Sequence, residues 1–155
     1  MAAEDDLLDK QPRDGELAAI ERQCFERPWK AADYAQLRGN PLVSAWVLRG
    51  GGGAPHGMVC FQLVAGEVEI FRIGVVPSQR RKGRGRKLVQ EVMEYAAGEG
   101  AAKVLLEVRS GNSAARSLYN TMGFRQVGTR EGYFQNPRED ALIFGRNTDI
   151  ESRGG

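Results

Sequence analysis

The sequence is poor in the residue types that build metal sites. Among its 155 residues it has one histidine and two cysteines, Cys24 and Cys60, and no Cys-x-x-Cys pair. Structural and catalytic zinc sites need several Cys and His side chains at short spacing, so we expect no bound metal. The acidic start MAAEDDLLDK has no apolar signal core, and no segment approaches the roughly 20 apolar residues that span a bilayer. We therefore expect a cytoplasmic protein without membrane contact and with reduced thiols.

The sequence also has no large excess of charge of one sign, because its 22 Lys and Arg residues are nearly balanced by 20 Asp and Glu residues, for a net charge of +2. This balance argues against wholesale nucleic-acid binding, and we expect no direct contact with DNA. A chain of 155 residues that is 41% hydrophobic can form one domain with a proper core but not two. We assign residues 1–146 to a single domain, expect a monomer, and expect the polar residues 147–155 to form a flexible tail.

Apolar spacing and turn residues predict a mixed α/β sheet. Helices are predicted over residues 15–25, with Asp14 as N-cap, and over residues 31–37. Strands are predicted over residues 43–48, 58–64 and 67–76, and the four glycines of residues 50–53 are predicted to form a hairpin loop. After a further helix that ends at Gly98 and Gly100, a strand is predicted over 104–108, buried on both faces except for Glu107. A short helix capped by Asn112 or Ser113 and ended by Gly123, and strands over 125–130 and 140–144, complete the chain. We predict a mostly antiparallel sheet with helices on both faces.

The most informative segment is the basic loop of residues 80–87, which reads Arg-Arg-Lys-Gly-Arg-Gly-Arg-Lys. It lies between the apolar strand 68–76 and helically spaced apolar residues that begin at Leu88. Glycine lets backbone approach a ligand closely, and the unpaired N–H groups of a helix's first turn favour anionic oxygens. Charge alone would favour a solvated face or a polyanion patch over a defined pocket. The glycine spacing at a strand-to-helix junction favours a phosphate site instead.

Two nucleotide-binding motifs do not fit this loop. A Walker loop requires Gly-x-x-x-x-Gly-Lys followed by Ser or Thr, and a dinucleotide-binding loop requires Gly-x-Gly-x-x-Gly. Lys87 and Leu88 occupy places that these patterns fill otherwise. The phosphate group is therefore expected to belong to another kind of ligand.

The loop resembles the acetyl-CoA motif of the GNAT N-acetyltransferases, Gln/Arg-x-x-Gly-x-Gly/Ala, which is satisfied by Arg80, Gly83 and Gly85. Further motifs along residues 16–146 are similar to those of the bacterial ribosomal-protein alanine acetyltransferases in that family. They are Cys24-Phe25 with Pro28-Trp29, Leu106-Glu107-Val108-Arg109, Asn112, Leu118-Tyr119, Gly123-Phe124, Gly132-Tyr133 and Arg138-Glu139-Asp140-Ala141. The resemblance implies the GNAT acyl-CoA N-acyltransferase fold, acetyl-CoA as co-substrate, and the N-terminal segment of a ribosomal protein as partner.

The resemblance implies two catalytic residues. Glu107 interrupts an apolar strand and matches the glutamate assigned as proton acceptor; a surface carboxylate, or a salt bridge to Arg109 or another cation, is the alternative. Tyr119 matches the tyrosine assigned as the acid that protonates the CoA thiolate, and a phenol with a pKa near 10 stays protonated at neutral pH. The alternative for Tyr119 is a core position beside Leu118 and Met122.

The resemblance also assigns the cofactor and acceptor contacts. The backbone of Ile73, Gly74 and Val75 is expected to pair with the pantetheine, and the N–H of Val75 to stabilise the oxyanion. The pyrophosphate is expected to be bound by the loop, namely Arg80, Arg81, Lys82, Gly83, Arg84, Gly85 and Arg86. Asn112 matches a cofactor-binding position, although capping the next helix is an equal alternative.

The acceptor side is expected to involve the segments around Trp29 and Tyr133. Trp29 suits a peptide contact or simple core packing equally well, and Glu69 suits the acceptor amine or an ordinary exposed strand position. Departures from the family pattern include Gly74 where alanine is common, Gly111 where serine is common, Phe134 in place of a second tyrosine, and the four-glycine hairpin. Two rival functions remain: a GNAT acting on a small amine or a lysine side chain, and a non-catalytic module that binds ribosomal RNA.

Overall fold

The fold is taken from a computed structural model, which describes residues 6–149. Over this range seven strands form one mixed sheet in the order β1-β2-β3-β4-β5-β7-β6, accompanied by four α-helices. In chain order the elements are β1 (Leu7–Asp9), α1 (Asp14–Cys24), α2 (Ala31–Arg38), β2 (Val43–Arg49), β3 (Pro55–Val64), β4 (Glu67–Val75), the 3-10 turn η2 (Pro77–Gln79), α3 (Arg84–Gly98), β5 (Lys103–Arg109), α4 (Ser113–Thr121), β6 (Arg125–Phe134) and β7 (Glu139–Asn147). The β4–β5 pair is parallel, and the β1–β2, β2–β3, β5–β7 and β6–β7 pairs are antiparallel. The predicted mixed, mostly antiparallel sheet is confirmed.

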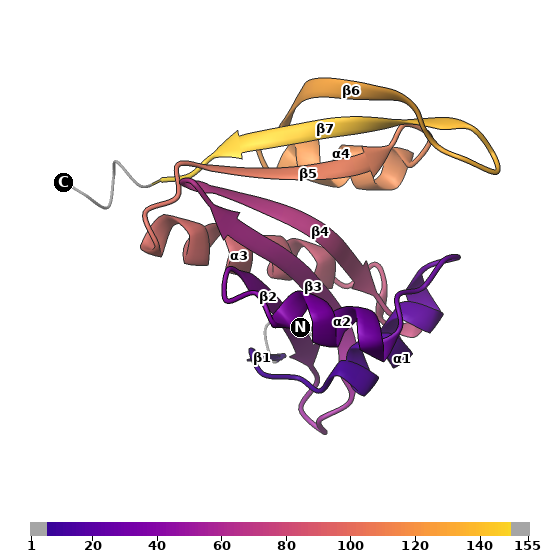
Figure 1. The fold of residues 1–155 in the computed structure, drawn as a ribbon, viewed down its shortest axis with the longest axis vertical. Helices are drawn as coiled ribbons and strands as arrows, with labels where there is room; N and C mark the ends of the chain where they lie inside the picture. Colours follow the sequence, from indigo (N-terminus) through magenta and orange to yellow (C-terminus); the bar gives the residue numbers. More distant parts are fainter. Residues whose placement is uncertain (1–5, 150–155) are drawn as a thin grey trace. The chain divides into compact units, whose positions relative to one another are not determined.

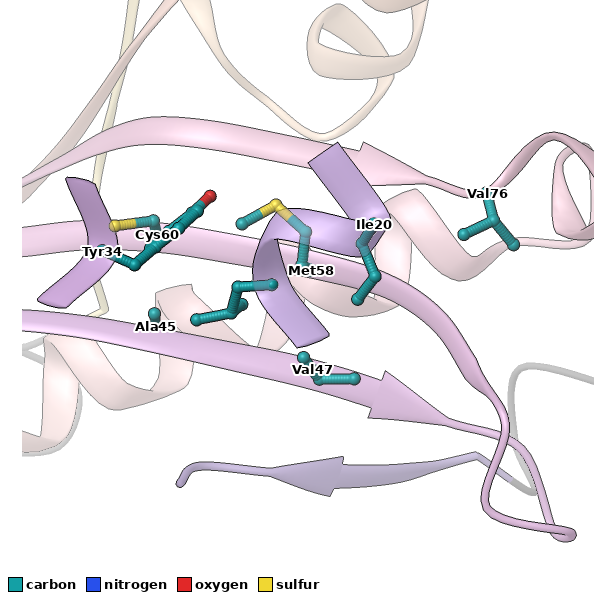
Figure 2. Packing of buried hydrophobic residues seen from close by; sticks show 8 residues of the cluster. Ile20, Tyr34, Ala45, Val47, Met58, Cys60 and Val76 are labelled. Carbon is teal, nitrogen blue, oxygen red and sulfur yellow. The ribbon is translucent and has the colours of Figure 1, made fainter. Parts of the chain in front are cut away.

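The chain divides into two compact units, residues 1–62 with 71–92 and residues 63–70 with 93–155, which we describe separately. In the first unit, α1 and α2 lie over one face of β2 and β3 (Figure 1). The apolar faces of these four elements meet in one cluster of buried residues, which Val76, the residue after β4, completes. Most of the cluster is labelled in Figure 2: Leu17, Ile20, Tyr34, Ala45, Val47, Met58, Cys60 and Val76. Each fully buried aliphatic side chain here stabilises the fold by about 1.5–3 kcal/mol relative to an exposed one. The apolar side chains whose helical spacing predicted α1 therefore pack in this core.

The other face of β2 and β3 carries Trp46 and Phe61, whose rings meet edge to face with centroids 4.8 Å apart. A Cβ at Gly57 would lie 3.2 Å from Leu88 Cδ1, so the start of α3 packs on this second face. The side chains of β2 and β3 are divided between two packed faces because successive side chains of a strand point to opposite faces of a sheet. In this unit the sheet has helices on both faces, as predicted.

The N-cap prediction for α1 is wrong. Asp14 is the first helical residue, and the N-cap is Arg13, which makes no side-chain capping bond. The Asp14 carboxylate instead accepts a hydrogen bond from Arg38 Nη1 at 2.8 Å. A partner on α2 therefore takes the carboxylate that local sequence suggested for the cap, while the acid still lies in the first turn, where it favours the helix dipole.

The predicted hairpin at the four glycines is confirmed, since β2 and β3 are antiparallel neighbours and Gly53 N donates to Gly50 O at 2.9 Å. A Cβ at Gly50 would lie 2.3 Å from the ring of His56, and Gly53 has a φ of 91°. The left-handed conformation of Gly53 therefore favours glycine in the turn, and a side chain at Gly50 would make the His56 ring shift.

In the second unit, the segment Glu67–Ile70 of β4 pairs in parallel with Lys103–Leu106 of β5, which confirms the predicted strand-helix-strand crossover. β5 is followed in space by β7 and β6, and α4 lies against this part of the sheet (Figure 1). Tyr119 of α4 contacts the rings of Phe124 and Phe144, with centroids 5.8 and 6.4 Å away. These aromatic contacts join α4 to the sheet.

The prediction that β5 is buried on both faces except at Glu107 is wrong. Val104, Leu106 and Val108 are buried, but Lys103, Leu105, Glu107 and Arg109 on the other face are only half-buried. Three of those four side chains are charged. The charged group of such a side chain stays near water, while its aliphatic part covers apolar surface. Burial of β5 thus alternates, and Glu107 belongs to a half-open face.

The C-terminal end of β7 reaches Asn147, the first residue of the predicted tail. Thr148 then donates from its backbone N–H to Ala102 O at 2.9 Å and from its hydroxyl to Ala101 O at 2.6 Å. The rest of that tail, residues 150–155, lies outside the described residues. Among residues 6–149, no helix has the length and apolar character to cross a membrane.

Candidate active site

A basic, glycine-containing loop leads from β4 into α3 in the first unit. Arg81 and Gly83 have positive φ values of 64° and 82°, and α3 begins at the next residue, Arg84. Left-handed residues of this kind turn neighbouring N–H groups to one side, and the first turn of a helix adds unpaired N–H groups. This turn contains no acidic residue that would compete with an anion. The loop geometry suits a phosphate group.

The Arg84 side chain, expected among the phosphate-loop cations, lies in a buried cluster. It is 3% exposed, and its Nε lies 2.6 Å from Asp6 Oδ2 and 2.9 Å from His56 Nδ1. Its Nη1 is buried and has no hydrogen-bond partner among residues 6–149. The cluster holds the first residue of α3 against the start of β3 and the segment before β1. Sequence reasoning missed it because Asp6 and Arg84 are 78 positions apart.

Asp6 is ionised in this cluster. Burial opposes ionisation of its carboxyl, but hydrogen bonds from Arg84 and His56 outweigh burial and lower its pKa below the usual 3.8. A carboxyl whose pKa is lower in the folded state contributes stability above the pKa of the unfolded state. That contribution is lost as the pH falls below about 4 through the folded pKa.

Replacing Asp6 with asparagine is expected to lower the free energy of unfolding by about 3 kcal/mol at pH 7, because the buried Arg84 charge loses its counterion. Urea denaturation monitored by circular dichroism would measure this change. The matched control is Asp14→Asn, whose partner Arg38 is partly exposed, and we expect a loss of at most about 1 kcal/mol. Equal losses in the two variants would contradict the assignment of Asp6–Arg84 as the buried pair.

The end of β4 carries Ile73, Gly74 and Val75, all half-buried. A Cβ at Gly74 would lie 3.1 Å from Cys24 Cβ and 3.2 Å from Phe25 Cζ, so glycine is what lets the end of α1 approach this strand closely. Arg80 folds back and donates from Nε to Val75 O at 2.8 Å. The strand end, the loop and the end of α1 are therefore brought together in the first unit.

The surroundings of Trp29 fit both roles that the sequence suggested, a peptide contact and core packing. Its ring is half-buried, 5.5 Å from the Tyr34 ring, and the Arg72 guanidinium lies 4.5 Å from it. Its backbone N–H donates to Glu21 Oε1 at 2.9 Å. Glu21 is fully buried and was not predicted as a functional residue, although its spacing of four from Leu17 places it on the apolar face of α1.

Glu107, the predicted base, lies on the half-open face of β5 in the second unit. Its side chain is 27% exposed, but its Oε2 is buried and accepts no hydrogen bond from residues 6–149. Arg130 Nε of β6 lies 3.6 Å from that oxygen. Of the cations considered for Glu107, the partner is therefore Arg130, while Arg109 pairs with Glu139 at 3.3 Å.

Tyr119, the predicted acid, is almost completely buried, with 6% of its surface exposed. Burial raises the pKa of its phenol to about 12, because a phenolate would lose its hydration. The hydroxyl therefore stays protonated at every pH that the protein experiences. The ring contacts with Phe124 and Phe144 also fit the alternative of a core position, so the two readings of Tyr119 are compatible.

Asn112 is the N-cap of α4, since its Oδ1 accepts from Ala115 N at 3.1 Å. The turn before it is fixed by Glu139, whose Oε2 accepts from Gly111 N at 2.6 Å. A Cβ at Gly111 would lie 2.7 Å from that same oxygen, so a side chain here would make the Glu139 carboxylate shift. The capping alternative for Asn112 is confirmed, and a role toward the cofactor stays a prediction.

Tyr133 and Glu69 were the other predicted acceptor contacts. Tyr133 is 50% exposed, and the Arg130 guanidinium lies 5.3 Å from its ring. Glu69 pairs with Leu105 across the parallel β4–β5 ladder, which places its side chain on the same face as Glu107. The second unit thus gathers Glu107, Arg130 and Tyr133, with Glu69 on the neighbouring strand.

Metal ligands are not gathered anywhere in the described part of the chain: it has no group of three or more His, Cys, Asp or Glu side chains placed to bind an ion. Cys24 and Cys60 are free thiols. Burial raises the pKa of Cys24, and raises that of Cys60 to about 12, so neither is a ready thiolate at neutral pH.

Comparison with known proteins places this geometry in a family. Residues 15–124 match the acetyltransferase (GNAT) family. The chain is 32% identical over 126 residues to the [ribosomal protein bS18]-alanine N-acetyltransferase of Escherichia coli K12, covering 80% of this chain and 84% of the relative. It is also 32% identical to the N-alpha-acetyltransferase RimI of Mycobacterium tuberculosis, with 84% of each chain covered.

The fold agrees with a solved structure. The crystal structure of the ribosomal-protein-S18-alanine N-acetyltransferase from Escherichia coli superposes with a TM-score of 0.84 at 27% identity, covering 92% of this chain and 93% of that one. The family match spans most of the chain and includes both the basic loop and Tyr119. The protein therefore belongs to the GNAT family of acetyltransferases.

Proposed function

We propose that this acetyltransferase transfers the acetyl group of acetyl-CoA to the α-amino group of an N-terminal alanine, that of the ribosomal small-subunit protein bS18. The observation that carries the proposal is the carboxylate of Glu107, whose buried Oε2 accepts no hydrogen bond from the described residues and is balanced only by Arg130 at 3.6 Å. A carboxylate with a vacant lone pair in a protected position can take a proton from an amine. The match to the [ribosomal protein bS18]-alanine N-acetyltransferase of Escherichia coli supports the choice of acceptor, and the match to an N-alpha-acetyltransferase of Mycobacterium tuberculosis supports an α-amine.

The residues of the first unit fit the donor. Bound acetyl-CoA supplies an acetyl group activated as a thioester. The loop from Arg80 to Arg86 and the first turn of α3 would hold its pyrophosphate through backbone N–H groups and exposed cations such as Arg81 and Lys82, while the Arg84 side chain stays in its buried ion pair with Asp6. The backbone of Ile73, Gly74 and Val75 at the end of β4 would pair with the pantetheine. The N–H of Val75 would stabilise the negative charge that develops on the carbonyl oxygen of the acetyl group.

The proton of the acceptor amine is assigned to Glu107. An N-terminal α-amine has a pKa near 8, against about 10.4 for a lysine side chain, so a much larger fraction of it is already uncharged at neutral pH. Glu107 would accept the proton that remains, directly or through one water molecule. An α-amine thus depends less on proton abstraction than a lysine side chain does.

The proton for the departing CoA thiolate is assigned to Tyr119. Its phenol is held protonated by burial, with a pKa of about 12. The parent thiol, with a pKa near 8.5, is a stronger acid than this phenol, so the transfer is unfavourable by itself, and the phenolate that it leaves would regain a proton from water after CoA departs. The buried hydroxyl also keeps the proton from bulk water.

Synthetic peptides would test the acceptor. We expect the protein with acetyl-CoA to release free thiol fastest with a peptide that begins with alanine, more slowly with serine or methionine, and not at all with an Nα-acetylated peptide that carries lysine. Release with the blocked peptide alone would favour a lysine or small-amine acetyltransferase. Cofactor binding without release from any N-terminal peptide would reject the proposal, and salt-sensitive RNA binding with no acetyl-CoA binding would favour the RNA module.

A further inference from the structure

Glu21 is a fully buried carboxylate in α1, surrounded by hydrogen-bond donors. Tyr34 donates its hydroxyl to Oε2 at 2.5 Å, and the backbone N–H of Trp29 donates to Oε1 at 2.9 Å. Arg72 of β4 completes the set with two parallel hydrogen bonds, from Nε at 3.1 Å and from Nη2 at 2.5 Å. A carboxylate buried this deeply needs such a counterion, so Glu21 fixes the position of the Arg72 guanidinium.

Arg72 lies against two aromatic rings of the connection between α1 and α2. Its guanidinium is 4.1 Å from the ring of Phe25 and 4.5 Å from the ring of Trp29. Its Nη2 also donates to the backbone oxygen of Arg27 at 3.3 Å. A planar guanidinium can make a bidentate ion pair and contact aromatic faces at the same time, which an ammonium cannot.

The connection from Phe25 to Lys30 has no regular secondary structure, so side chains must fix its backbone. Glu21 accepts the N–H of Trp29, and Arg72 donates to the carbonyl of Arg27. Pro28 has no N–H to offer. The Glu21–Arg72 pair therefore supplies hydrogen bonds to backbone groups at the centre of this connection. In a helix or a strand, other backbone groups would provide these hydrogen bonds.

The same connection touches the end of the donor strand. Cys24 and Phe25 lie within 3.2 Å of the position of a Cβ at Gly74, two residues after Arg72 in β4. One arginine thus ties the Phe25–Trp29 segment to the strand whose next three residues, Ile73 to Val75, are assigned to the acetyl donor. All of these contacts lie within the first unit.

We propose that Arg72, held by Glu21, is a positioning residue that fixes the Phe25–Trp29 segment as a rigid wall for the N-terminal residues of the acceptor peptide. This inference rests on the proposed function, since it needs a peptide acceptor. The pair acts on acceptor binding rather than on the chemical step. A buried ion pair often adds little net stability over apolar side chains, so its specific contribution is the fixed geometry of the segment.

Substitution of Arg72 separates positioning from folding. In Arg72→Gln we expect the KM for an alanine-starting peptide to rise about tenfold, while kcat and the Kd of acetyl-CoA stay unchanged, because only the acceptor wall loosens. Arg72→Lys keeps the charge but loses the second hydrogen bond and the flat contact with the rings, and should restore the KM only partly. Arg22→Gln, on the exposed side of α1, is the matched control and should leave all three constants unchanged.

The outcomes are distinguishable when steady-state kinetics and thermal unfolding are measured on the same samples. An unchanged KM with a lower Tm would make the pair purely structural and overturn the inference. Equal increases in peptide KM and acetyl-CoA Kd would show a disturbed donor strand and overturn it as well. If Arg72→Gln does not fold, the Arg72→Lys KM decides. Failure of the proposed function has a different signature, because the unaltered protein would then bind acetyl-CoA but acetylate no N-terminal peptide.

Discussion

Replacing Glu107 with glutamine is expected to lower kcat for an alanine-starting peptide by about 10²- to 10⁴-fold at pH 7, the range that general-base catalysis contributes. Glutamine has the same shape, so the strand and the acceptor site should persist, but a neutral amide cannot accept the proton of the amine. Peptide KM and acetyl-CoA Kd should change little. Thiol release under saturating acetyl-CoA would measure kcat, and isothermal titration would measure the Kd.

The pH dependence sharpens this prediction. As the pH rises through about 8, the α-amine loses its own proton, so the glutamine variant should regain part of its activity relative to the unaltered protein. Glu94→Gln, at an exposed position of α3, is a matched control and should behave as the unaltered protein at every pH. A kcat in Glu107→Gln within a factor of about three of the control would assign the base elsewhere, with Glu69 on the same face of the sheet as the next candidate.

The strand and helix pattern could be predicted from the sequence because it is encoded locally. Apolar periodicity and terminal glycines placed α2, β2 and α4 within one or two residues, whereas β3 begins at Pro55, three residues before its predicted start. The errors arose where a distant partner or a tertiary environment decides. The Asp14 carboxylate does not cap α1, because it pairs with Arg38, which is 24 residues away. The second face of β5 is only half-buried because it carries charged residues.

The same contrast holds for the candidate site. Glu107 was singled out because a carboxylate interrupts an apolar strand, a signal that is visible in five consecutive residues, and its predicted role as base came from the resemblance to the family motif. The Glu21–Arg72 pair could not be predicted, because 51 positions separate its members and each looks ordinary in its own element. Arg84 was grouped with the loop cations, but Asp6, a residue before the first strand, draws it into the interior. Long-range ion pairs are set by the fold and leave no local pattern.

The ion pair between Arg130 and Glu107 links β5 to the part of β6 that carries Tyr133 in the second unit. Arg130 lies 3.6 Å from the carboxylate and 5.3 Å from the ring of Tyr133, so one cation contacts both. Asp140 holds the intervening Gly132, whose φ is 59°, through a hydrogen bond of 2.8 Å from the Gly132 N–H. The Arg138-Glu139-Asp140-Ala141 motif therefore has a physical basis: Glu139 fixes the turn before α4, and Asp140 fixes the strand that presents Tyr133.

Replacing Tyr119 with phenylalanine is expected to lower kcat by about 10²-fold or more without changing the Kd of acetyl-CoA, because the departing thiolate loses its proton donor while the buried ring remains. Stability should change little, since the ring contacts with Phe124 and Phe144 are retained. Tyr95→Phe in α3 removes a phenolic hydroxyl from another helix and is the matched control for kcat. Burst kinetics with a good acceptor peptide would show whether the chemical step has become limiting.

The raised pKa of Tyr119 gives this assignment a second test. With a pKa of about 12, the phenol is protonated at all lower pH values, so the unaltered protein should show no loss of its acid between pH 7 and about 10. Incorporation of a fluorotyrosine at position 119 lowers the phenol pKa, and kcat should then decline at a lower pH than in the unaltered protein. If Tyr119→Phe retains full kcat, or if the fluorinated phenol leaves the pH profile unmoved, Tyr119 is a core residue of α4 and the proton reaches the thiolate from another donor, such as water.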